Sequence, residues 1–469
     1  MSGSHSFDPT VLREYDIRGV VGRTLGSADA EAIGRAFATI AAPDGGSDGT
    51  GDGGGKTFCV GYDGRVSSPE LEAALVAGLN AGGADVIRVG LGPTPMLYYA
   101  VHSLGADGGI MVTGSHNPPD NNGFKLMLGK SSFFGAGIQQ LGAVAAAGTY
   151  REGSGASRDD PMLLRYVARV AEESAALAPL KVVWDAGNGA AGEAMVLLTA
   201  ELPGEHILLN ERIDGTFPAH HPDPTMPVNL VQLIAAVRAG GCDLGIAFDG
   251  DGDRIGIVDG GGEILWGDQI LALLARPVLA NQPGATIIAD VKASQVLFDE
   301  VARLGGKPLI WKTGHSLIKA KMAEIGAPLA GEMSGHIFFA DRYHGYDDAL
   351  YAAVRMLGVI CDEGQSLAEL RASLPQRINT PELRFECADG RKFDAIEEVR
   401  QRLASSGADV DAIDGVRVST KDGWWLLRAS NTQPVLVARC EANDEAGLAH
   451  LKLQLVAQLS ESGIEPPDF

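Results

Sequence analysis

Short apolar runs rich in Val and Ile alternate along most of the chain with longer segments rich in Ala and Leu. Runs that are apolar on both faces are typical of central strands in an α/β sheet, and the longer segments would be the helices that cover it. The pattern predicts one helix over about residues 28–40 and another over about residues 68–82. We therefore expect the greater part of the chain to fold as α/β units.

An apolar run that ends in an Asp-centred turn occurs three times, at residues 58–65 (FCVGYDGR), 181–188 (KVVWDAGN) and 286–293 (TIIADVKA). Each is followed about 40–70 residues later by a second run that ends in a polar loop, VTGSHNP, FDGDGDR or LAGEMSGH. One α/β unit used three times would give this pattern, although Gly/Asp turns after strands are also common by chance. In such units ligands gather at the carboxyl ends of strands, which is where all three loops fall.

The pattern changes near residue 380, where the runs resemble strands of a more antiparallel sheet. We expect strands at residues 381–387, 416–420, 424–430 and 434–442, and helices at residues 393–404 and 445–459. These elements predict a smaller α+β domain at the end of the chain. Residues 43–55, by contrast, are low in complexity, rich in Gly and Asp and without periodicity, and indicate a flexible surface loop.

The length of 469 residues exceeds what one hydrophobic core ordinarily serves. With the repeat and the change near residue 380, it predicts four domains, at residues 1–158, 159–263, 264–376 and 377–469. The expected fold class is α/β, with three related α/β domains followed by a C-terminal α+β domain.

The net charge of the chain argues against two classes of binding partner. The formal charge is −22, and such a field repels nucleic acid and anionic membranes. We therefore expect neither as a partner. A phosphorylated substrate would need a local basic pocket built against this net charge.

Cysteine usage and hydropathy bear on location. The five cysteines are scattered and form no CxxC pair, which argues against a disulfide framework and a zinc site. The first residues lack the basic and apolar regions of a secretory signal. The longest apolar candidate, residues 270–280, is interrupted by Arg276 and Pro277 and is too short to span a membrane. We expect a cytoplasmic protein with reduced thiols. The sequence does not indicate an oligomeric state, and a monomer is compatible with it.

Residues 111–118 (MVTGSHNP) place Ser115 in a Gly-containing loop directly after an apolar run. Gly114 permits an unusual backbone angle, and Pro118 limits the conformations of the adjoining backbone. An ordinary turn would have the same composition. A neutral serine needs a base or a charge to become a nucleophile, and His116 and Lys125 lie nearby in sequence.

Residues 248–254 (FDGDGDR) place Asp249, Asp251 and Asp253 at alternate positions between two apolar runs. An EF-hand loop would need Gly at its sixth position and Glu at its twelfth, where this chain has Arg254 and Gly260, so that match fails. Carboxylates this close raise one another's pKa unless a cation joins them. The cluster predicts a Mg²⁺ site, with a solvated acidic turn as the alternative, and Arg254 can clamp a carboxylate or a phosphate.

Two further loops carry polar groups suited to a sugar phosphate. In GEMSGH, Glu332 and Ser334 suit sugar hydroxyls and His336 can move a proton near neutral pH. The RASNTQP loop offers a guanidinium fork, hydroxyls and backbone N–H groups to a phosphate, from Arg428, Ser430, Asn431 and Thr432. Each loop alone could be a simple turn. Arg18 lies in a short charged stretch, where a surface salt bridge is the alternative. Lys292 and His315 follow apolar runs and are weaker candidates.

The motifs YDIRG, TGSHNP, NGFK, DGDGDR, KTGHS, GEMSGH and RASNTQP occur in this order along the chain. As an ordered set they resemble the α-D-phosphohexomutase superfamily, and most closely its bacterial phosphomannomutase/phosphoglucomutase group, across essentially the whole sequence. The resemblance implies four domains, three related α/β units and a C-terminal α+β unit, around a central active-site cleft. This agrees with the repeat found independently.

The resemblance also implies roles for individual residues. Ser115 would be the phosphoserine, and one of its oxygens would join Asp249, Asp251 and Asp253 in holding Mg²⁺. Glu332 and Ser334 would bind the sugar O3 and O4 hydroxyls, and the loop with Arg428, Ser430, Asn431 and Thr432 the phosphate that does not react. The other site residues would be Tyr15, Arg18, His116, Lys125, Arg254, Lys292, His315 and His336. Lys125, His336, His315 and Arg18 all stay open as the general base.

The implied reaction is the interconversion of hexose 1-phosphate and hexose 6-phosphate through a hexose 1,6-bisphosphate that turns over within the cleft. Glucose 1,6-bisphosphate, or another hexose 1,6-bisphosphate, would be the activator. A site that reads O3 and O4 would accept glucose and mannose, which differ at C2. Phosphoglucosamine mutases usually differ at Met333 and Gly114, so that activity ranks second. A phosphatase and a non-catalytic sugar-phosphate-binding regulator are the rival functions.

Overall fold

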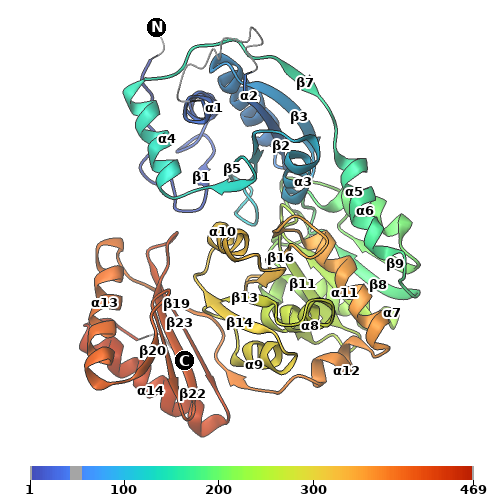
Figure 1. Cartoon of the computed structure of the whole chain (residues 1–469), viewed down its shortest axis with the longest axis vertical. Helices are drawn as coiled ribbons and strands as arrows, with labels where there is room; N and C mark the ends of the chain where they lie inside the picture. The colour runs from blue at the N-terminus through green and yellow to red at the C-terminus, as the bar shows by residue number, and fades with distance from the viewer. Residues whose placement is uncertain (1–2, 43–54, 467–469) are drawn as a thin grey trace.

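A computed structural model of the chain describes residues 3–42 and 55–466. The predicted loop at residues 43–55 therefore lies, apart from its last residue, outside the described residues. Within them the strands form four sheets of seven, five, five and six strands, in chain order. Figure 1 shows the four units, from the first in blue at the top to the fourth in red at the lower left.

The first unit has a sheet in the order β1-β5-β4-β2-β3-β7, with β6 paired to β5. Both predicted helices form, since α1 and α2 match residues 28–40 and 68–82 closely. The elements are β1 (Ile17–Val20), α1 (Ser27–Ala41), β2 (Thr57–Tyr62), α2 (Ser68–Ala81), β3 (Asp85–Leu91), α3 (Thr94–Leu104), β4 (Gly108–Val112), β5 (Asn121–Leu128), β6 (Ser131–Phe133), α4 (Ala136–Ala147) and β7 (Ser157–Asp159).

The second unit has a sheet in the order β12-β11-β10-β8-β9. Its elements are α5 (Leu163–Ala171), η1 (Glu172–Ser174), β8 (Leu180–Asp185), α6 (Gly192–Glu201), β9 (Gly204–Leu209), η2 (Pro227–Leu230), α7 (Val231–Gly240), β10 (Leu244–Phe248), β11 (Ile255–Asp259) and β12 (Ile264–Leu265).

The third unit has a sheet in the order β14-β13-β15-β16-β17. Its elements are α8 (Gly267–Asn281), β13 (Thr286–Asp290), α9 (Gln295–Arg303), β14 (Lys307–Trp311), α10 (His315–Ile325), β15 (Leu329–Gly331), β16 (Ile337–Phe339), β17 (Tyr346–Asp347), α11 (Ala349–Glu363) and α12 (Leu367–Ala372).

The same strand arrangement recurs in all three units. In each, a first strand (β2, β8 or β13) pairs in parallel with two neighbours, and the second neighbour (β4, β10 or β15) forms an antiparallel pair with the next strand. The three predicted repeats fall on β2, β8 and β13, and the polar loops follow β4, β10 and β15. The repeat predicted from the apolar runs is therefore present, and it brings the same loop of each unit to an equivalent edge of its sheet.

The fourth unit is an α+β domain whose sheet runs β18-β23-β22-β21-β20, with β19 also paired to β23. All predicted strands and helices form, but α13 starts before the predicted residue 393. The short strands β18 and β20 were not predicted, because two or three residues carry too little pattern. The elements are β18 (Ile378–Asn379), β19 (Leu383–Glu386), α13 (Asp389–Ser406), β20 (Asp409–Asp411), β21 (Val416–Thr420), β22 (Gly423–Ala429), β23 (Val435–Ala442) and α14 (Glu445–Glu461).

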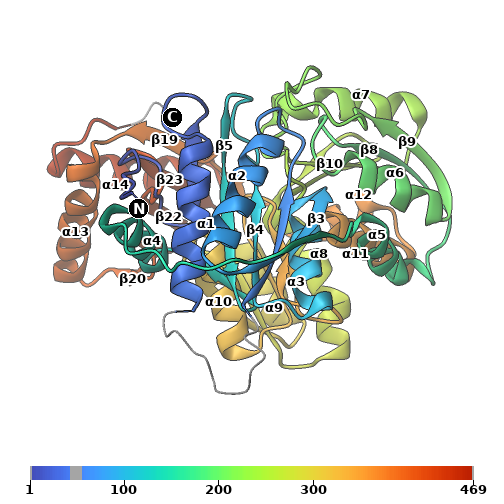
Figure 2. The same ribbon diagram turned by 90° about the horizontal axis from the view of Figure 1, so that it is seen from above.

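Helices α1 and α2 lie side by side in the first unit (Figure 2). Two glycines let their backbones approach closely. A Cβ atom on Gly34 would lie 2.3 Å from the Leu75 carbonyl oxygen, and one on Gly78 would lie 2.1 Å from that of Glu31. Any larger residue at either position would separate the helices.

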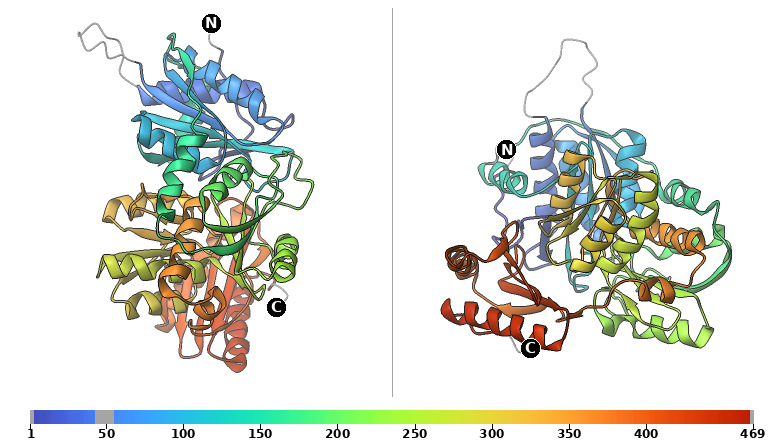
Figure 3. Two further views of the ribbon diagram at one scale, coloured as in Figure 1. Left: turned by 90° about the vertical axis from the view of Figure 1, so that its right-hand side faces the viewer. Right: turned by 60° about the horizontal axis from the view of Figure 1, so that its bottom comes forward.

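The first three units share one hydrophobic core, which runs from Leu97 in α3 through Trp184 and Phe248 to Leu357 in α11. The fourth unit has its own core around Trp425 and Leu451. Figure 3 shows that unit as a separate lobe beside the others. None of the helices in the described part of the chain is long and apolar enough to cross a bilayer.

Candidate active site

The Ser115 loop joins the antiparallel strands β4 and β5 of the first unit. Ser115 is 3% exposed, and its hydroxyl donates to Asp249 Oδ2 at 2.8 Å, across to the second unit. Its φ of 49° lies in the left-handed region, which non-glycine residues rarely occupy outside functional sites. The structure therefore brings the predicted nucleophile into direct contact with the predicted metal loop.

Asp249, Asp251 and Asp253 lie between β10 and β11, as predicted, and all three are fully buried. They can each place one carboxylate oxygen within 4.8 Å of the others. Asp251 Oδ1 and Asp253 Oδ1 are buried without a hydrogen-bond partner. Because a hard divalent cation takes carboxylate oxygens as ligands, these residues fit Mg²⁺. Burial and the two neighbouring carboxylates raise the pKa of Asp249 well above its ordinary value.

Lys125 on β5 reaches the same carboxylates. Its ammonium donates to Asp251 Oδ2 at 2.6 Å and also to Asp253 Oδ2. Burial opposes the charge on Lys125, but the two carboxylates hold its pKa above the ordinary value. Conversely, burial alone would raise the pKa of Asp251, yet Lys125 keeps it well below the usual range. One ammonium thus balances part of the charge of three carboxylates, and a cation would balance the rest.

Arg18 and His116 border the serine from the first unit. Arg18 is 6% exposed and pairs with Asp16 at 2.8 Å, so its ion pair is buried and not the surface pair that the sequence left open. It also donates to the carbonyl of Thr113 at 2.9 Å. His116 Nδ1 lies 3.2 Å from Ser115 Oγ. Burial, together with Arg254 and Arg18, holds the pKa of His116 well below its ordinary value, so its ring is neutral near pH 7.

Arg254 and His336 join the metal loop to the third unit. Arg254 Nε donates to His336 Nε2 at 3.0 Å, and His336 Nδ1 lies 3.1 Å from Asp347 Oδ2. The opposite ring nitrogens of His336 therefore face a donor and an acceptor, which fixes one tautomer. His315 stacks on His336 with ring centres 5.5 Å apart. Burial and then Lys319 hold the pKa of His315 well below its ordinary value.

Glu332 and Ser334 lie in the loop between β15 and β16, and Glu332 is 3% exposed. Glu332 accepts from the backbone N–H of Gly314 at 2.7 Å, which ties this loop to the KTGHS motif. Burial raises the pKa of Glu332. Lys292 follows β13, and its ammonium lies 3.0 Å from Glu382 Oε2 in the fourth unit.

The RASNTQP loop connects β22 and β23 in the fourth unit. Arg428 Nε donates to Asp414 Oδ2 at 3.0 Å, and Ser430 Oγ accepts from the backbone N–H of Thr432 at 3.3 Å. Asn431 Nδ2 donates to the hydroxyl of Tyr15 at 2.6 Å. The loop of the fourth unit therefore touches the first unit, and the first and fourth units meet at this site.

Several residues at the site had no role in the sequence analysis. Asp347 and Lys319 form an ion pair of 2.9 Å behind His336, and Thr94 donates to Asp251 at 2.5 Å. Asp414 holds Arg428, and Arg65 contacts the Ser115 loop. Only Arg65 had a sequence signal, because it ends the FCVGYDGR run; the others stand in no recurring motif and are recognisable only from their contacts.

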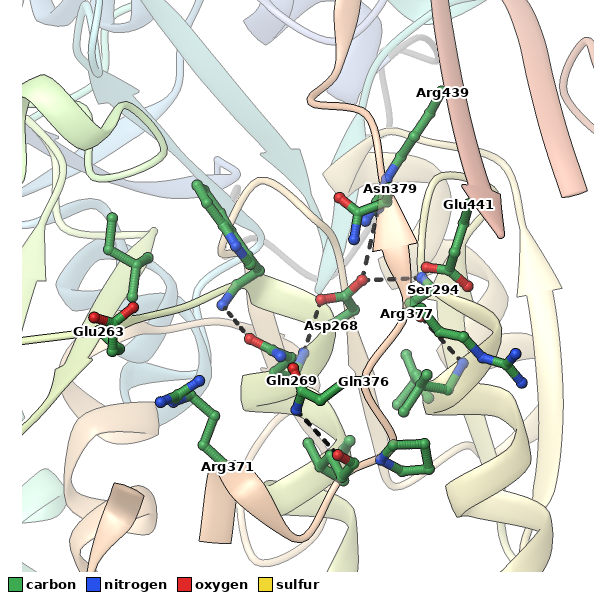
Figure 4. Close-up of a pocket in the computed structure, with 17 residues that line it drawn as sticks. Glu263, Asp268, Gln269, Ser294, Arg371, Gln376, Arg377, Asn379, Arg439 and Glu441 are labelled. Atoms are coloured by element: carbon green, nitrogen blue, oxygen red, sulfur yellow. Dashed lines mark hydrogen bonds and ion pairs between the residues drawn. The ribbon is translucent and has the colours of Figure 1, made fainter. Parts of the chain in front are cut away.

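A separate pocket of about 220 Å³ lies beside this site, where α8 and α12 meet β18 and β23. Figure 4 shows Asp268, Gln269, Arg371, Arg439 and Glu441 along its walls. No predicted site residue lines it. Arg439 is its link to the site, since its guanidinium donates to the carbonyl of Lys292 at 2.5 Å.

Four sequence families cover the chain in order. They are described as phosphoglucomutase/phosphomannomutase alpha/beta/alpha domain I (residues 9–140), domain II (164–262) and domain III (266–378), and the C-terminal domain (382–458).

Individual relatives agree. The chain is 43% identical over 450 residues to a phosphomannomutase/phosphoglucomutase of Pseudomonas aeruginosa, covering 96% of this chain and 95% of the relative. It is 41% identical over 453 residues to a phosphoglucomutase of Neisseria meningitidis, covering 95% and 96%. The crystal structure of a phosphoglucomutase/phosphomannomutase family protein from Burkholderia thailandensis matches this chain with a TM-score of 0.91 and 42% sequence identity. The match covers 98% of this chain and 100% of that one.

A mixed α/β chain with four such units and a buried serine beside three aspartates is a phosphohexomutase in architecture. The chain belongs to the phosphoglucomutase/phosphomannomutase family, within the α-D-phosphohexomutase superfamily. The predicted family, fold class and enzyme class are thereby confirmed. The predicted domain boundaries and residue roles stay predictions.

Proposed function

We propose that this protein interconverts the 1-phosphates and 6-phosphates of glucose and mannose through a phosphoserine at Ser115 and a hexose 1,6-bisphosphate. The observation that carries the proposal is the contact of Ser115 Oγ with Asp249 Oδ2 at 2.8 Å inside a buried cluster of three aspartates. A hydroxyl in that position can carry a phosphoryl group beside a divalent cation. The names of the relatives support the choice of substrates.

We propose Mg²⁺ as the metal, held by Asp249, Asp251 and Asp253 with a phosphoserine oxygen. When bound, the ion offsets negative charge on the transferring phosphoryl group. Lys125 and Arg254 supply the neighbouring positive charge from the protein itself, since Lys125 bonds Asp251 and Arg254 follows Asp253 directly.

In the first half-reaction the bond between phosphorus and Ser115 Oγ breaks as a bond to the O1 or O6 hydroxyl of the substrate forms. The hydroxyl loses its proton, and Ser115 Oγ gains one. In the second half-reaction the hexose 1,6-bisphosphate, after turning over, returns its other phosphoryl group to Ser115. The neutral ring of His116, 3.2 Å from Ser115 Oγ, is placed to exchange the proton of the serine.

The base for the substrate hydroxyl is a different group. In-line displacement puts that hydroxyl across the phosphorus from Ser115 Oγ, whereas His116 lies on the serine side. Lys125, His336, His315 and Arg18 stay the candidates for this role.

Substrate recognition divides between two loops. We assign the sugar hydroxyls O3 and O4 to Glu332 and Ser334. The phosphate that does not react is assigned to the RASNTQP loop with Arg428, Ser430, Asn431 and Thr432. We assign Tyr15, Lys292 and His315 as further substrate-binding residues. Since the bisphosphate must bind in both orientations, the RASNTQP loop has to bind either phosphate without making contacts that depend on the orientation of the sugar ring.

Other features are proposed from the same reasoning. Glucose 1,6-bisphosphate, or another hexose 1,6-bisphosphate, would restore a dephosphorylated Ser115. The four domains are assigned to residues 1–158, 159–263, 264–376 and 377–469. We propose no nucleic-acid or membrane partner; the oligomeric state is unknown, and a monomer is plausible. The five unpaired cysteines support a cytoplasmic location, where thiols stay reduced.

A coupled assay tests the function. Purified protein with Mg²⁺ and a trace of glucose 1,6-bisphosphate is given the 1-phosphates of glucose, mannose and glucosamine, and formation of each 6-phosphate is measured. Comparable rates on glucose and mannose are expected. A rate dominated by glucosamine would reassign the protein as a phosphoglucosamine mutase. Release of inorganic phosphate alone would indicate a phosphatase, and binding without turnover a regulator.

A further inference from the structure

Arg65 is a fully buried arginine in the turn after β2. Its guanidinium donates to four backbone carbonyls of the segment that carries the nucleophile. The distances are 2.6 Å to Ser115, Asn117 and Pro118 and 2.9 Å to Asn121. A single side chain thus donates hydrogen bonds to backbone carbonyls along most of the Ser115 loop.

Asp63 fixes this guanidinium from the other side. Asp63 Oδ2 lies 3.2 Å from Arg65 Nε, and it accepts from Thr113 Oγ1 at 2.8 Å and from the backbone N–H of Gly114 at 3.1 Å. Thr113 in turn accepts from the backbone N–H of Ser115 at 2.8 Å. Both the N–H and the carbonyl of Ser115 are therefore held, directly or through Thr113, by the Asp63–Arg65 pair.

Gly114 leaves the room that Arg65 occupies. A Cβ atom on Gly114 would lie 2.2 Å from Arg65 Nε, so an alanine there would displace the guanidinium. The second unit covers the pair from outside, with the Phe217 ring centre 5.1 Å from Arg65 Cζ. Neither Arg65 nor Asp63 contacts the carboxylates of Asp251 or Asp253 in the hydrogen bonds and ion pairs of the described residues.

We propose that Arg65 is a positioning residue that sets the geometry of phosphorylated Ser115, an inference that rests on the proposed function. It holds the left-handed backbone of Ser115 and turns the negative ends of the loop's peptide dipoles toward its own charge. The planar fork with five donors is essential, because a lysine offers three donors from one point and cannot span four carbonyls.

The test compares Arg65→Lys with Arg355→Lys. Arg355 in α11 is a matched control, since it is 6% exposed and donates to Asp341 at 2.8 Å, and its hydrogen bonds among the described residues go to Asp341 and Tyr351 and not to the Ser115 loop. Turnover is measured with glucose 1-phosphate, thermal unfolding by calorimetry, and the ³¹P signal of phosphorylated Ser115 after treatment with glucose 1,6-bisphosphate. Gly114→Ala, which displaces the guanidinium sterically, is the second variant.

For Arg65→Lys we expect kcat to fall by about 100-fold, the order of effect of a misplaced reacting group, with little change in KM. The ³¹P signal should move, and Gly114→Ala should show both changes. Arg355→Lys should lower the unfolding temperature while keeping kcat and the ³¹P signal. An Arg65→Lys protein with wild-type kcat, or with a ³¹P signal equal to the wild type, overturns the inference. A wild type without mutase activity instead refutes the proposed function, so the two failures are distinguishable.

Discussion

Ser115 combines an unfavourable backbone with a reactive position. A left-handed φ of 49° costs a non-glycine residue about 1 kcal/mol or more. Hydrogen bonds through Arg65 and Thr113 hold this conformation, and the side chain meets Asp249 as a result. Strain maintained by the surrounding structure at one loop residue is therefore what presents the hydroxyl to the metal loop.

Two substitutions of Ser115 distinguish the backbone strain at this residue from the catalytic role of its hydroxyl. Ser115→Ala and Ser115→Gly should both lose mutase activity almost completely, because neither has a hydroxyl to phosphorylate. Glycine adopts the left-handed region freely, so Ser115→Gly should be more stable than Ser115→Ala by about 1 kcal/mol. Activity assays and denaturant unfolding measure the two effects. Near wild-type turnover in a folded Ser115→Ala protein would rule out the phosphoserine mechanism.

Metal removal tests the three aspartates. A chelator should stop turnover reversibly, and saturating Mg²⁺ should stabilise the fold by about 2.7 kcal/mol at one hundred times its Kd. Asp251→Asn should lose most of this stabilisation. Asp259→Asn is the control, because Asp259 is equally buried but lies at the end of β11 away from the metal loop and pairs with Arg371 at 2.9 Å. Calorimetry with and without Mg²⁺ gives the comparison; equal Mg²⁺ shifts in the wild type and Asp251→Asn would contradict the assignment.

At the scale of elements, the N-terminus of α11 carries an unusual cap. Asp348 accepts from the backbone N–H of Tyr351 at 2.9 Å and from the hydroxyls of Tyr166 at 2.8 Å and Tyr343 at 2.9 Å. These bonds join α11 to α5 and to the turn before β17. Burial nevertheless raises the pKa of Asp348 to about 7.

This pKa predicts a pH dependence of stability. Below pH 4 Asp348 is protonated in both the folded and the unfolded chain and has no effect. Between about pH 4 and 7 the unfolded chain releases the proton and the folded chain retains it, so stability falls with rising pH, by roughly 4 kcal/mol at most. Asp348→Asn keeps a capping oxygen and should remove this decline.

Urea unfolding at pH 4, 5, 6 and 7 measures the slope. The control is Asp444→Asn, at the exposed cap of α14, where the side chain accepts from Gly447 at 2.7 Å. It should leave the slope as it is in the wild type. An Asp348→Asn protein whose stability declines like the wild type would show that another group is responsible.

At the scale of the whole molecule, the fourth unit is joined differently from the others. The first three share a core, whereas the fourth meets the third through a small apolar cluster of Val291, Trp424 and Leu426. Arg417 reinforces it: the guanidinium lies 3.7 Å from the centre of the Trp424 ring and donates to the carbonyls of Val291 and Ala293 at 2.7 Å. Polar contacts such as that of Lys292 with Glu382 add to the apolar cluster, and an interface more polar than a shared core is typical of units that move relative to each other.

Arg417→Ala should therefore release the fourth unit. We expect calorimetry to show an additional early transition, with an enthalpy of about 60 kcal/mol for a domain of this size. Arg400→Ala, which removes an exposed pair with Glu397, should unfold like the wild type. A single unshifted transition in Arg417→Ala would show that the other contacts of the fourth unit hold it in place without Arg417.

The reacting groups of this protein could be predicted from the sequence because each motif that carries them is a contiguous stretch of the chain. The Ser115 loop and the aspartates of FDGDGDR directly follow apolar runs, and a strand positions the residues at its end whatever the rest of the fold does. The threefold repeat of the α/β unit could be predicted for the same reason. Strand pattern and turn chemistry are local properties, so the α/β units and most elements of the fourth domain could be predicted.

Tertiary structure alone decided which of these groups touch. The hydrogen bond of Asn431 to Tyr15 spans 416 positions, and that of Lys125 to Asp251 spans 126. The four carbonyls bonded by Arg65 lie between 50 and 56 positions away from it. Such contacts depend on strand order, on register and on how whole units pack. No local pattern encodes those, so the sequence determined the reacting groups and the fold determined their geometry.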